Sequence, residues 1–91
     1  MLVDVELVRR SLPTSRIRDA IRAELDAITL YEEIARSMDR PDIAKVFRDI
    51  AFEEKVHLYE FLFTLALLDS DLLRAASRAR SELQELGVIK D

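Results

Sequence analysis

Two long segments of this sequence repeat apolar residues every three or four positions, and that spacing restricts the fold more than any other feature. The first segment covers 16–38 and the second covers 41–68. Apolar residues spaced in this way form one face of an α-helix. The 91 residues include one glycine and two prolines, too few turn-forming residues for a sandwich, a barrel or a nucleotide-binding α/β domain. The sequence therefore predicts an all-α fold.

Turn and capping residues divide the chain into a lead-in and three helices within a single domain, 1–91. The lead-in covers 1–13, and the pair Thr14-Ser15 then gives a helix-start signal for a first helix over 16–38. The second helix covers 41–68. The third, shorter helix follows Ser70, covers 71–86 and stops at Gly87. Because the turn near Arg40 is short, the first two helices are expected to form an antiparallel hairpin.

Charge and cysteine content narrow the function classes. Cysteine is absent, which excludes disulfides, thiolate nucleophiles and cysteine-ligated zinc or iron–sulfur centres. Eighteen acidic residues against fourteen basic ones give a net charge of −4, so no nucleic-acid partner is expected. The apolar run 61–68 is too short to span a bilayer, and no secretory signal opens the sequence. We expect a cytoplasmic protein with no membrane partner.

Polar side chains interrupt the two apolar seams at three positions. Glu24 interrupts the first seam, and Glu54 and His57 interrupt the second; His57 is the chain's one histidine. A buried carboxylate is costly unless it is paired, protonated or bound to a metal. The two seams consist of Ile17, Ile21, Glu24, Ile28, Tyr31, Ala35 and Met38, and of Ile43, Phe47, Ile50, Glu54, His57, Phe61, Leu65 and Leu68.

These three polar side chains are expected to meet. At ~1.5 Å per residue, Glu24 and Glu54 both lie roughly 21–24 Å from the turn near Arg40, and His57 follows Glu54 by about one helical turn. Two carboxylates and an imidazole are ligands for iron, manganese or zinc. The alternative is a core histidine that is satisfied by Glu54 and binds no metal. The additional burial of Glu24 favours the metal site.

The spacing Glu54-x-x-His57 is typical of dimetal sites in four-helix bundles. A full site of that kind needs two lone glutamates and two Glu-x-x-His units. One chain supplies half of this set, and a two-helix hairpin cannot cover its own apolar seam. The sequence therefore predicts a homodimer that completes the four-helix bundle and binds metal through Glu24, Glu54 and His57. Tyr31, two turns from Glu24, either hydrogen-bonds a ligand carboxylate or packs in the core.

A family resemblance covers about 17–86. The sequence resembles the encapsulated ferritins, cargo proteins of encapsulin nanocompartments that carry half a ferritin bundle per chain. The resemblance implies a ferroxidase whose substrates are Fe(II) and O2, with a di-iron centre shared by two subunits. It also implies a ring-like higher oligomer inside an encapsulin shell. The implied catalytic residues are Glu24, Glu54, His57 and Tyr31. The resemblance rests on Glu24-Leu25-Asp26-Ala27, Tyr31, Asp49 and Glu53-Glu54-Lys55-Val56-His57.

Two features depart from that family. An acidic residue of an outer metal-entry site is replaced by Ala23, which leaves only Asp26 nearby. The sequence also ends at Asp91 without the family's shell-targeting peptide. Three explanations stay open: the peptide was removed, the protein is linked to its shell in another way, or the protein does not act inside a shell.

Three other functions stay as alternatives: a rubrerythrin-like peroxidase, a structural helical oligomer that binds metal without turnover, and a helical adaptor that binds no metal. A second apolar stripe on the second helix predicts another subunit interface, and Glu32 is expected to pair with Arg36 on its own helix. The stripe consists of Phe52, Val56, Tyr59, Phe63 and Leu67.

Overall fold

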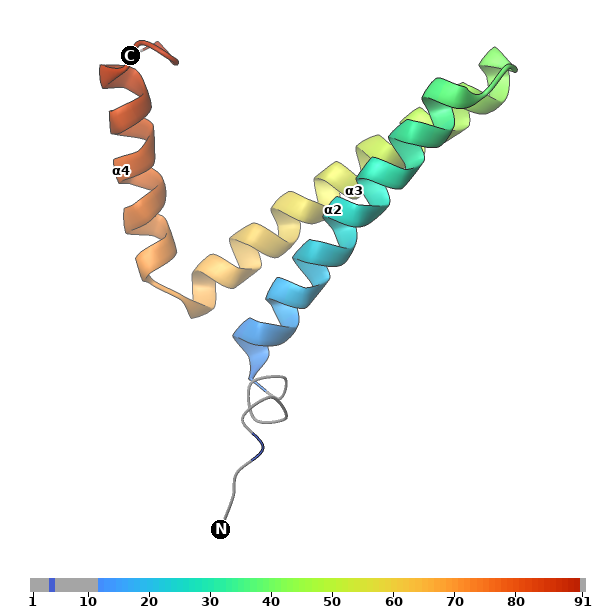
Figure 1. The fold of residues 1–91 in the computed structure, drawn as a ribbon. Coiled ribbons are helices and arrows are strands. Elements are labelled where there is room, and N and C mark those ends of the chain that lie inside the picture. Colours follow the sequence, from blue (N-terminus) through green and yellow to red (C-terminus); the bar gives the residue numbers. More distant parts are fainter. Residues whose placement is uncertain (1–3, 5–11, 91) are drawn as a thin grey trace.

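The computed structural model describes residue 4 and residues 12–90, and this described part contains three helices and no strand. They are α2 (Pro13–Ser37), α3 (Pro41–Leu68) and α4 (Asp71–Glu85). Figure 1 shows α2 and α3 lying side by side as an antiparallel hairpin, from which α4 turns away. The prediction of an all-α hairpin with a shorter third helix is confirmed. The predicted lead-in lies largely outside the described residues.

The start of α2 differs from the prediction. We expected Thr14 and Ser15 to precede a helix over 16–38, but α2 begins at Pro13 and ends at Ser37. Proline suits the first helical position because its fixed φ is already helical and that position needs no N–H donor. Ser15 is consequently buried inside the first turn. The bounds of α3 coincide with the predicted 41–68, and Pro41 occupies the same first position there.

The ends of α4 are held by local hydrogen bonds. The Asp69 side chain accepts a hydrogen bond from the Asp71 N–H at 3.1 Å, whereas Ser70, the expected cap, makes no side-chain capping bond. The helix ends at Glu85, one residue before the predicted end. Gly87 then adopts a φ of 74°, the left-handed conformation that favours glycine after a helix.

Alanines make up most of the buried apolar core of the hairpin. The buried apolar residues of the described chain are Ile28, Ala35, Ala44, Ala51 and Leu65. Two members of the predicted α3 seam are left partly uncovered by the single hairpin, since Ile50 is 38% exposed and Leu68 is 55% exposed. Ala51, by contrast, is only 2% exposed, so its face of α3 is the one that packs inside the hairpin. Ile50, about 100° further round the helix, lies at the edge of the contact.

Two ion pairs join the helices at different heights. The Arg18 guanidinium lies 3.3 Å from the Asp69 carboxylate, near the open end of the hairpin. Lys55 Nζ lies 3.0 Å from Glu32 Oε2, closer to the turn. Glu32 therefore pairs across the hairpin with Lys55, not with Arg36 as expected from helix spacing. Exposed ion pairs of this kind each contribute less than about 1 kcal/mol to the free energy of unfolding. They nevertheless favour one register of α2 against α3.

None of the helices in the described residues is both long enough and apolar enough to cross a membrane.

Candidate metal centre

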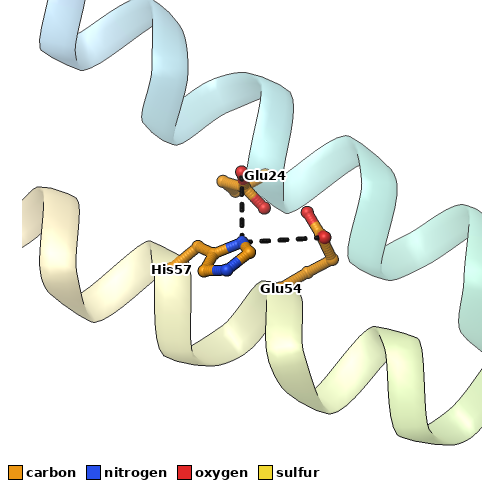
Figure 2. A group of neighbouring side chains, drawn as sticks. All are labelled: Glu24, Glu54 and His57. Atoms are coloured by element: carbon orange, nitrogen blue, oxygen red, sulfur yellow. Dashed lines mark ion pairs between the residues drawn. The ribbon is translucent and has the colours of Figure 1, made fainter.

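Three side chains from two helices meet at the middle of the hairpin. Glu24 extends from α2, and Glu54 and His57 extend from successive turns of α3 (Figure 2). The register of the hairpin sets their common height, because Glu24 and Glu54 lie at similar distances from the turn. One carboxylate oxygen of each glutamate and one imidazole nitrogen lie within 4.8 Å of one another. The structure thus brings together the three residues that interrupt the predicted seams.

His57 lies between the two carboxylates. Its Nδ1 is 3.7 Å from Glu54 Oε1 and 3.9 Å from Glu24 Oε1, and these two contacts are drawn as dashed lines in Figure 2. The separations exceed hydrogen-bond length, so the imidazole does not satisfy either carboxylate fully. The side chains are 16% exposed at Glu24, 21% at Glu54 and 45% at His57. The carboxylates are mostly covered by the hairpin, whereas the imidazole reaches its surface.

Glu24 has the least favourable electrostatic environment of the three. A hydrogen bond with the Glu54 side chain, burial and the charge of Glu54 raise the pKa of Glu24 above its ordinary value, and His57 opposes this shift. Its Oε2 atom is buried without a hydrogen-bond partner. A carboxylate oxygen that lacks both water and a donor is costly, and a cation bound there would remove that cost. The donor set therefore fits a metal ion.

Oxygen and imidazole donors suit iron, manganese and zinc, and a site with two carboxylates favours the harder ions of this group. Within residue 4 and residues 12–90, no second group of three or more such donors gathers in this way. Asp26 and Glu53, which flank the ligands in sequence, are exposed and lie outside the cluster. An outer acidic site is consequently not assembled by the described part of a single chain.

Tyr31 contributes to packing between the helices. Its ring faces Phe47 of α3 with the ring centres 6.1 Å apart and the planes tilted by 46°. In the described part of the chain its hydroxyl makes no hydrogen bond to Glu24 or Glu54. The predicted role of Tyr31 beside the ligands therefore stays a prediction.

Sequence spacing did not indicate the pair between Lys55 and Glu32, since neither residue belongs to a seam.

Comparison with known proteins finds ferritin-like relatives of this chain. A family model described as Rubrerythrin matches residues 16–85, which include all three candidate ligands. A solved structure described as the encapsulated ferritin domain from Pyrococcus furiosus superposes with a TM-score of 0.80 at 34% sequence identity. That superposition covers 100% of this chain and 99% of the other.

Two curated relatives match in sequence. The ferritin-like–encapsulin shell fusion protein of Pyrococcus furiosus is 36% identical over 90 residues, which cover 92% of this chain and 26% of the relative. The encapsulin nanocompartment cargo protein EncB of Myxococcus xanthus is 39% identical over 56 residues, 62% of this chain and 35% of the relative. The chain thus spans about a quarter to a third of the length of these relatives.

Proposed function

Since the chain belongs to the rubrerythrin family and shares the fold of an encapsulated ferritin domain, we propose that it is a ferroxidase. Its substrates are Fe(II) and O2, and its product is Fe(III). The observation that carries this proposal is the cluster of Glu24, Glu54 and His57, in which the Oε2 atom of Glu24 is buried without a hydrogen-bond partner. Carboxylate ligands stabilise Fe(III) more than Fe(II), which lowers the reduction potential and favours oxidation.

The complete site takes two copies of the chain. One chain supplies two carboxylates and one imidazole, half of the ligand set in a ferritin-like dimetal bundle. The partial exposure of His57 supports this arrangement, because a second hairpin can still reach the imidazole. In the proposed dimer, the carboxylates of Glu24 and Glu54 from both chains would hold two iron ions, and each His57 would supply a nitrogen ligand. Two Fe(II) ions held there would give up one electron each, and O2 would take up these two electrons and two protons from water to become H2O2.

The names of the relatives suggest where the oxidised iron goes. One relative is fused to an encapsulin shell and the other is described as encapsulin cargo. We infer that this chain also works inside an encapsulin nanocompartment in the cytoplasm and delivers Fe(III) to its interior. A ring-like oligomer larger than the dimer is part of the same proposal.

The test is anaerobic loading with Fe(II) followed by exposure to air. We expect a ferric absorbance band that saturates at about one iron per chain, the ratio of a two-iron site shared by two chains. Glu54→Gln and His57→Ala should abolish the band. Glu53→Gln, an exposed carboxylate next to Glu54, serves as the matched control and should retain it. Rates in both ligand variants equal to that of the unaltered chain reject the assignment.

The match to a rubrerythrin family model makes peroxide reduction the second candidate function. Both reactions need the same ligands, so the ligand variants do not separate them. Oxidation of Fe(II) by O2 and by H2O2, measured side by side on the loaded protein, does so. A large preference for peroxide favours the peroxidase. Bound metal without turnover by either oxidant indicates a structural metal site.

A further inference from the structure

An apolar stripe runs along one side of α3 and is not covered by the described part of the chain. The exposed fractions of its members range from 40% at Val56 to 84% at Leu67. The stripe lies opposite the metal ligands, because Phe63 follows Glu54 by nine residues and each residue turns the helix by about 100°. The members of this α3 stripe are Phe52, Val56, Tyr59, Phe63 and Leu67.

Helix α4 carries an apolar stripe of its own. The helix diverges from α3 (Figure 1), and none of its residues is buried. Its apolar residues recur in steps of four and three, which places them on one side. An isolated helix of 15 residues is marginal in water, so this uncovered side favours contact with another surface. The members of the α4 stripe are Leu72, Ala76, Ala79, Leu83 and Leu86.

The two stripes match in length and border one apolar groove. Each spans roughly 21–23 Å at about 1.5 Å per residue. The groove has a volume of about 450 Å³, with large Tyr59 and Phe63 on its α3 wall and small Ala76 and Ala79 on its α4 wall. Large side chains on one helix and small ones on the other let two helices pack closely.

A link of two residues joins the helices. Helix α3 ends at Leu68 and α4 begins at Asp71, so only Asp69 and Ser70 lie between them. Asp69 is extended, with φ −130° and ψ 95°, and Ser70 is already helical, with φ −64° and ψ −22°. Loops of two residues are long enough to join antiparallel helices. A change of backbone angles at these two residues is therefore sufficient to fold α4 back along α3.

Folding back about this link places the two stripes in register. Residues that are equally far from the link then lie at the same height. Val56 and Leu83 are equally far from it along the chain, and so are Phe63 and Ala76. The heights of the other members agree to within about one residue, or ~1.5 Å. An antiparallel α4 therefore covers the α3 stripe along its whole length.

Unpaired opposite charges meet along one edge of this contact. Glu60 directly follows Tyr59 on α3, and Arg80 directly follows Ala79 on α4. When two helices pack antiparallel, residues that follow matched stripe positions lie along the same edge. Both side chains are exposed, and none of the ion pairs among the described residues includes either of them. Closure therefore gives each of these two charges a partner.

The other edge is complementary as well. Lys55 directly precedes Val56, and Glu82 directly precedes Leu83, so a second pair of opposite charges shares this edge. A parallel arrangement of the same two helices is excluded by the short link. The direction that the link imposes is thus the direction in which the charges match.

We propose that α4 is a hinged helix that folds back on α3 of its own chain, packs antiparallel to it and covers the α3 stripe. The open arrangement in Figure 1 is then one of two states of the chain. Any molecule that occupies the stripe, including the second subunit expected from the sequence, must first displace α4. The metal ligands lie on the other side of α3, so the closed state is independent of the proposed ferroxidase function.

The first test uses a disulfide as the reporter, because the chain contains no cysteine. A disulfide needs Cα atoms about 4.4–6.8 Å apart, which Val56→Cys and Leu83→Cys reach only in the closed state. The matched control combines Val56→Cys with Ser81→Cys, an exposed position at a similar height on the opposite side of α4. In metal-free protein, the first pair should form a disulfide within one chain at least about tenfold faster than the control, at a rate independent of protein concentration.

The second test reverses single charges in the Val56→Cys, Leu83→Cys chain. Arg80→Glu should slow the cross-link roughly three- to tenfold, because it brings two negative charges together at one edge. Adding Glu60→Arg should restore the rate. Arg74→Glu, an exposed position on the outward side of α4, is the matched control and should leave the rate unchanged. Circular dichroism checks that each variant is still helical.

Three results overturn the proposal. Equal rates for the two cysteine pairs exclude closure. Disulfides that form between chains, and faster as the protein is concentrated, show that a second copy reaches the stripe in place of α4. A reversal at Arg80 that leaves the rate unchanged, or that Glu60→Arg fails to rescue, excludes the proposed register. Both tests are carried out without metal, so a failure of the ferroxidase proposal does not affect their outcome.

Discussion

Glu24→Gln should stabilise the metal-free protein, although it removes a proposed ligand. Glu24 carries a raised pKa because it shares a mostly buried site with Glu54, and its Oε2 atom has no hydrogen-bond partner. A glutamine has the same shape, carries no charge and offers an N–H₂ group that can donate to the Glu54 carboxylate. The substitution therefore removes a repulsion and supplies a donor in the same place.

The size of the effect follows from the geometry. One oxygen from each carboxylate lies within 4.8 Å of the other, and two unit charges at that separation repel by roughly 3 kcal/mol at an effective dielectric constant of about 20. Two effects reduce this repulsion: Glu24 keeps its proton to a higher pH because its pKa is raised, and solvent reaches the one-fifth of the Glu54 side chain that is exposed. We expect a gain of about 1–2 kcal/mol, which corresponds to a rise in Tm on the order of 5–10 °C.

The gain should depend on pH in a defined direction. A raised pKa means that folded Glu24 binds its proton more tightly than the unfolded chain, whose ordinary value is 4.5. The metal-free wild-type chain therefore loses stability as pH rises from that value through the raised one. The advantage of Glu24→Gln should be largest at neutral to alkaline pH and should shrink toward pH 4.5.

The assay is thermal unfolding at fixed protein concentration with chelator, over a series of pH values. Glu53→Gln, which removes an exposed carboxylate from the same region, should not change Tm appreciably. Excess Mn²⁺ should reverse the order, because a ligand at about 100 times its Kd adds roughly 2.7 kcal/mol to the chain that binds it. A chelated Glu24→Gln variant that melts at or below the wild-type temperature at about pH 8 would refute this account of Glu24.

Three further substitutions test the fold. Ala51→Leu places a larger side chain at a buried position of the hairpin and should lower the free energy of unfolding by about 1–3 kcal/mol in a urea titration. Glu53→Leu, nearby on the exposed side of α3, is its control. Gly87→Ala should reduce the local stability of the α4 end by about 1 kcal/mol, because alanine is strained at the positive φ of this position. Backbone amides near the end of α4 should then exchange hydrogen faster, and unchanged exchange would contradict the prediction. Asp69→Ala removes both the ion pair with Arg18 and the hydrogen bond from the Asp71 N–H, so it should lower the free energy of unfolding by about 1 kcal/mol. This loss should exceed that of Arg18→Ala, and the difference between the two variants should persist at high salt, which screens only the ion pair.

The sequence was sufficient for the features that depend on fixed helix geometry. The rise and rotation per residue are nearly constant, so the spacing of Glu24, Glu54 and His57 along the chain is enough to place them at one height and on facing sides of the hairpin. The inward face of α3 was less predictable. A pattern of bulky apolar residues selected Ile50, whereas the single hairpin buries its small neighbour Ala51 instead.

Contacts between helices were harder to predict than contacts within one. Spacing along a single helix suggested that Glu32 pairs with Arg36, but the hairpin brings Lys55 to it from the other helix. The predicted start of α2 was also displaced, because a proline can either end one helix or occupy the first position of the next. Pro13 was expected to precede the helix, whereas α2 begins at Pro13. In each case the sequence allowed two local solutions, and packing between segments selected one of them.

The alanine contact between α2 and α3 has a consequence for how this chain folds. Three of the five buried apolar residues in the described part of the chain are alanines, so closing the hairpin removes little hydrocarbon from water. In the proposed dimer, the second copy covers apolar surface that this thin interior leaves exposed, and we expect most of the stability to come from that contact. Folding and association should therefore be one reaction, and the temperature at which the helices melt should rise as the protein is concentrated.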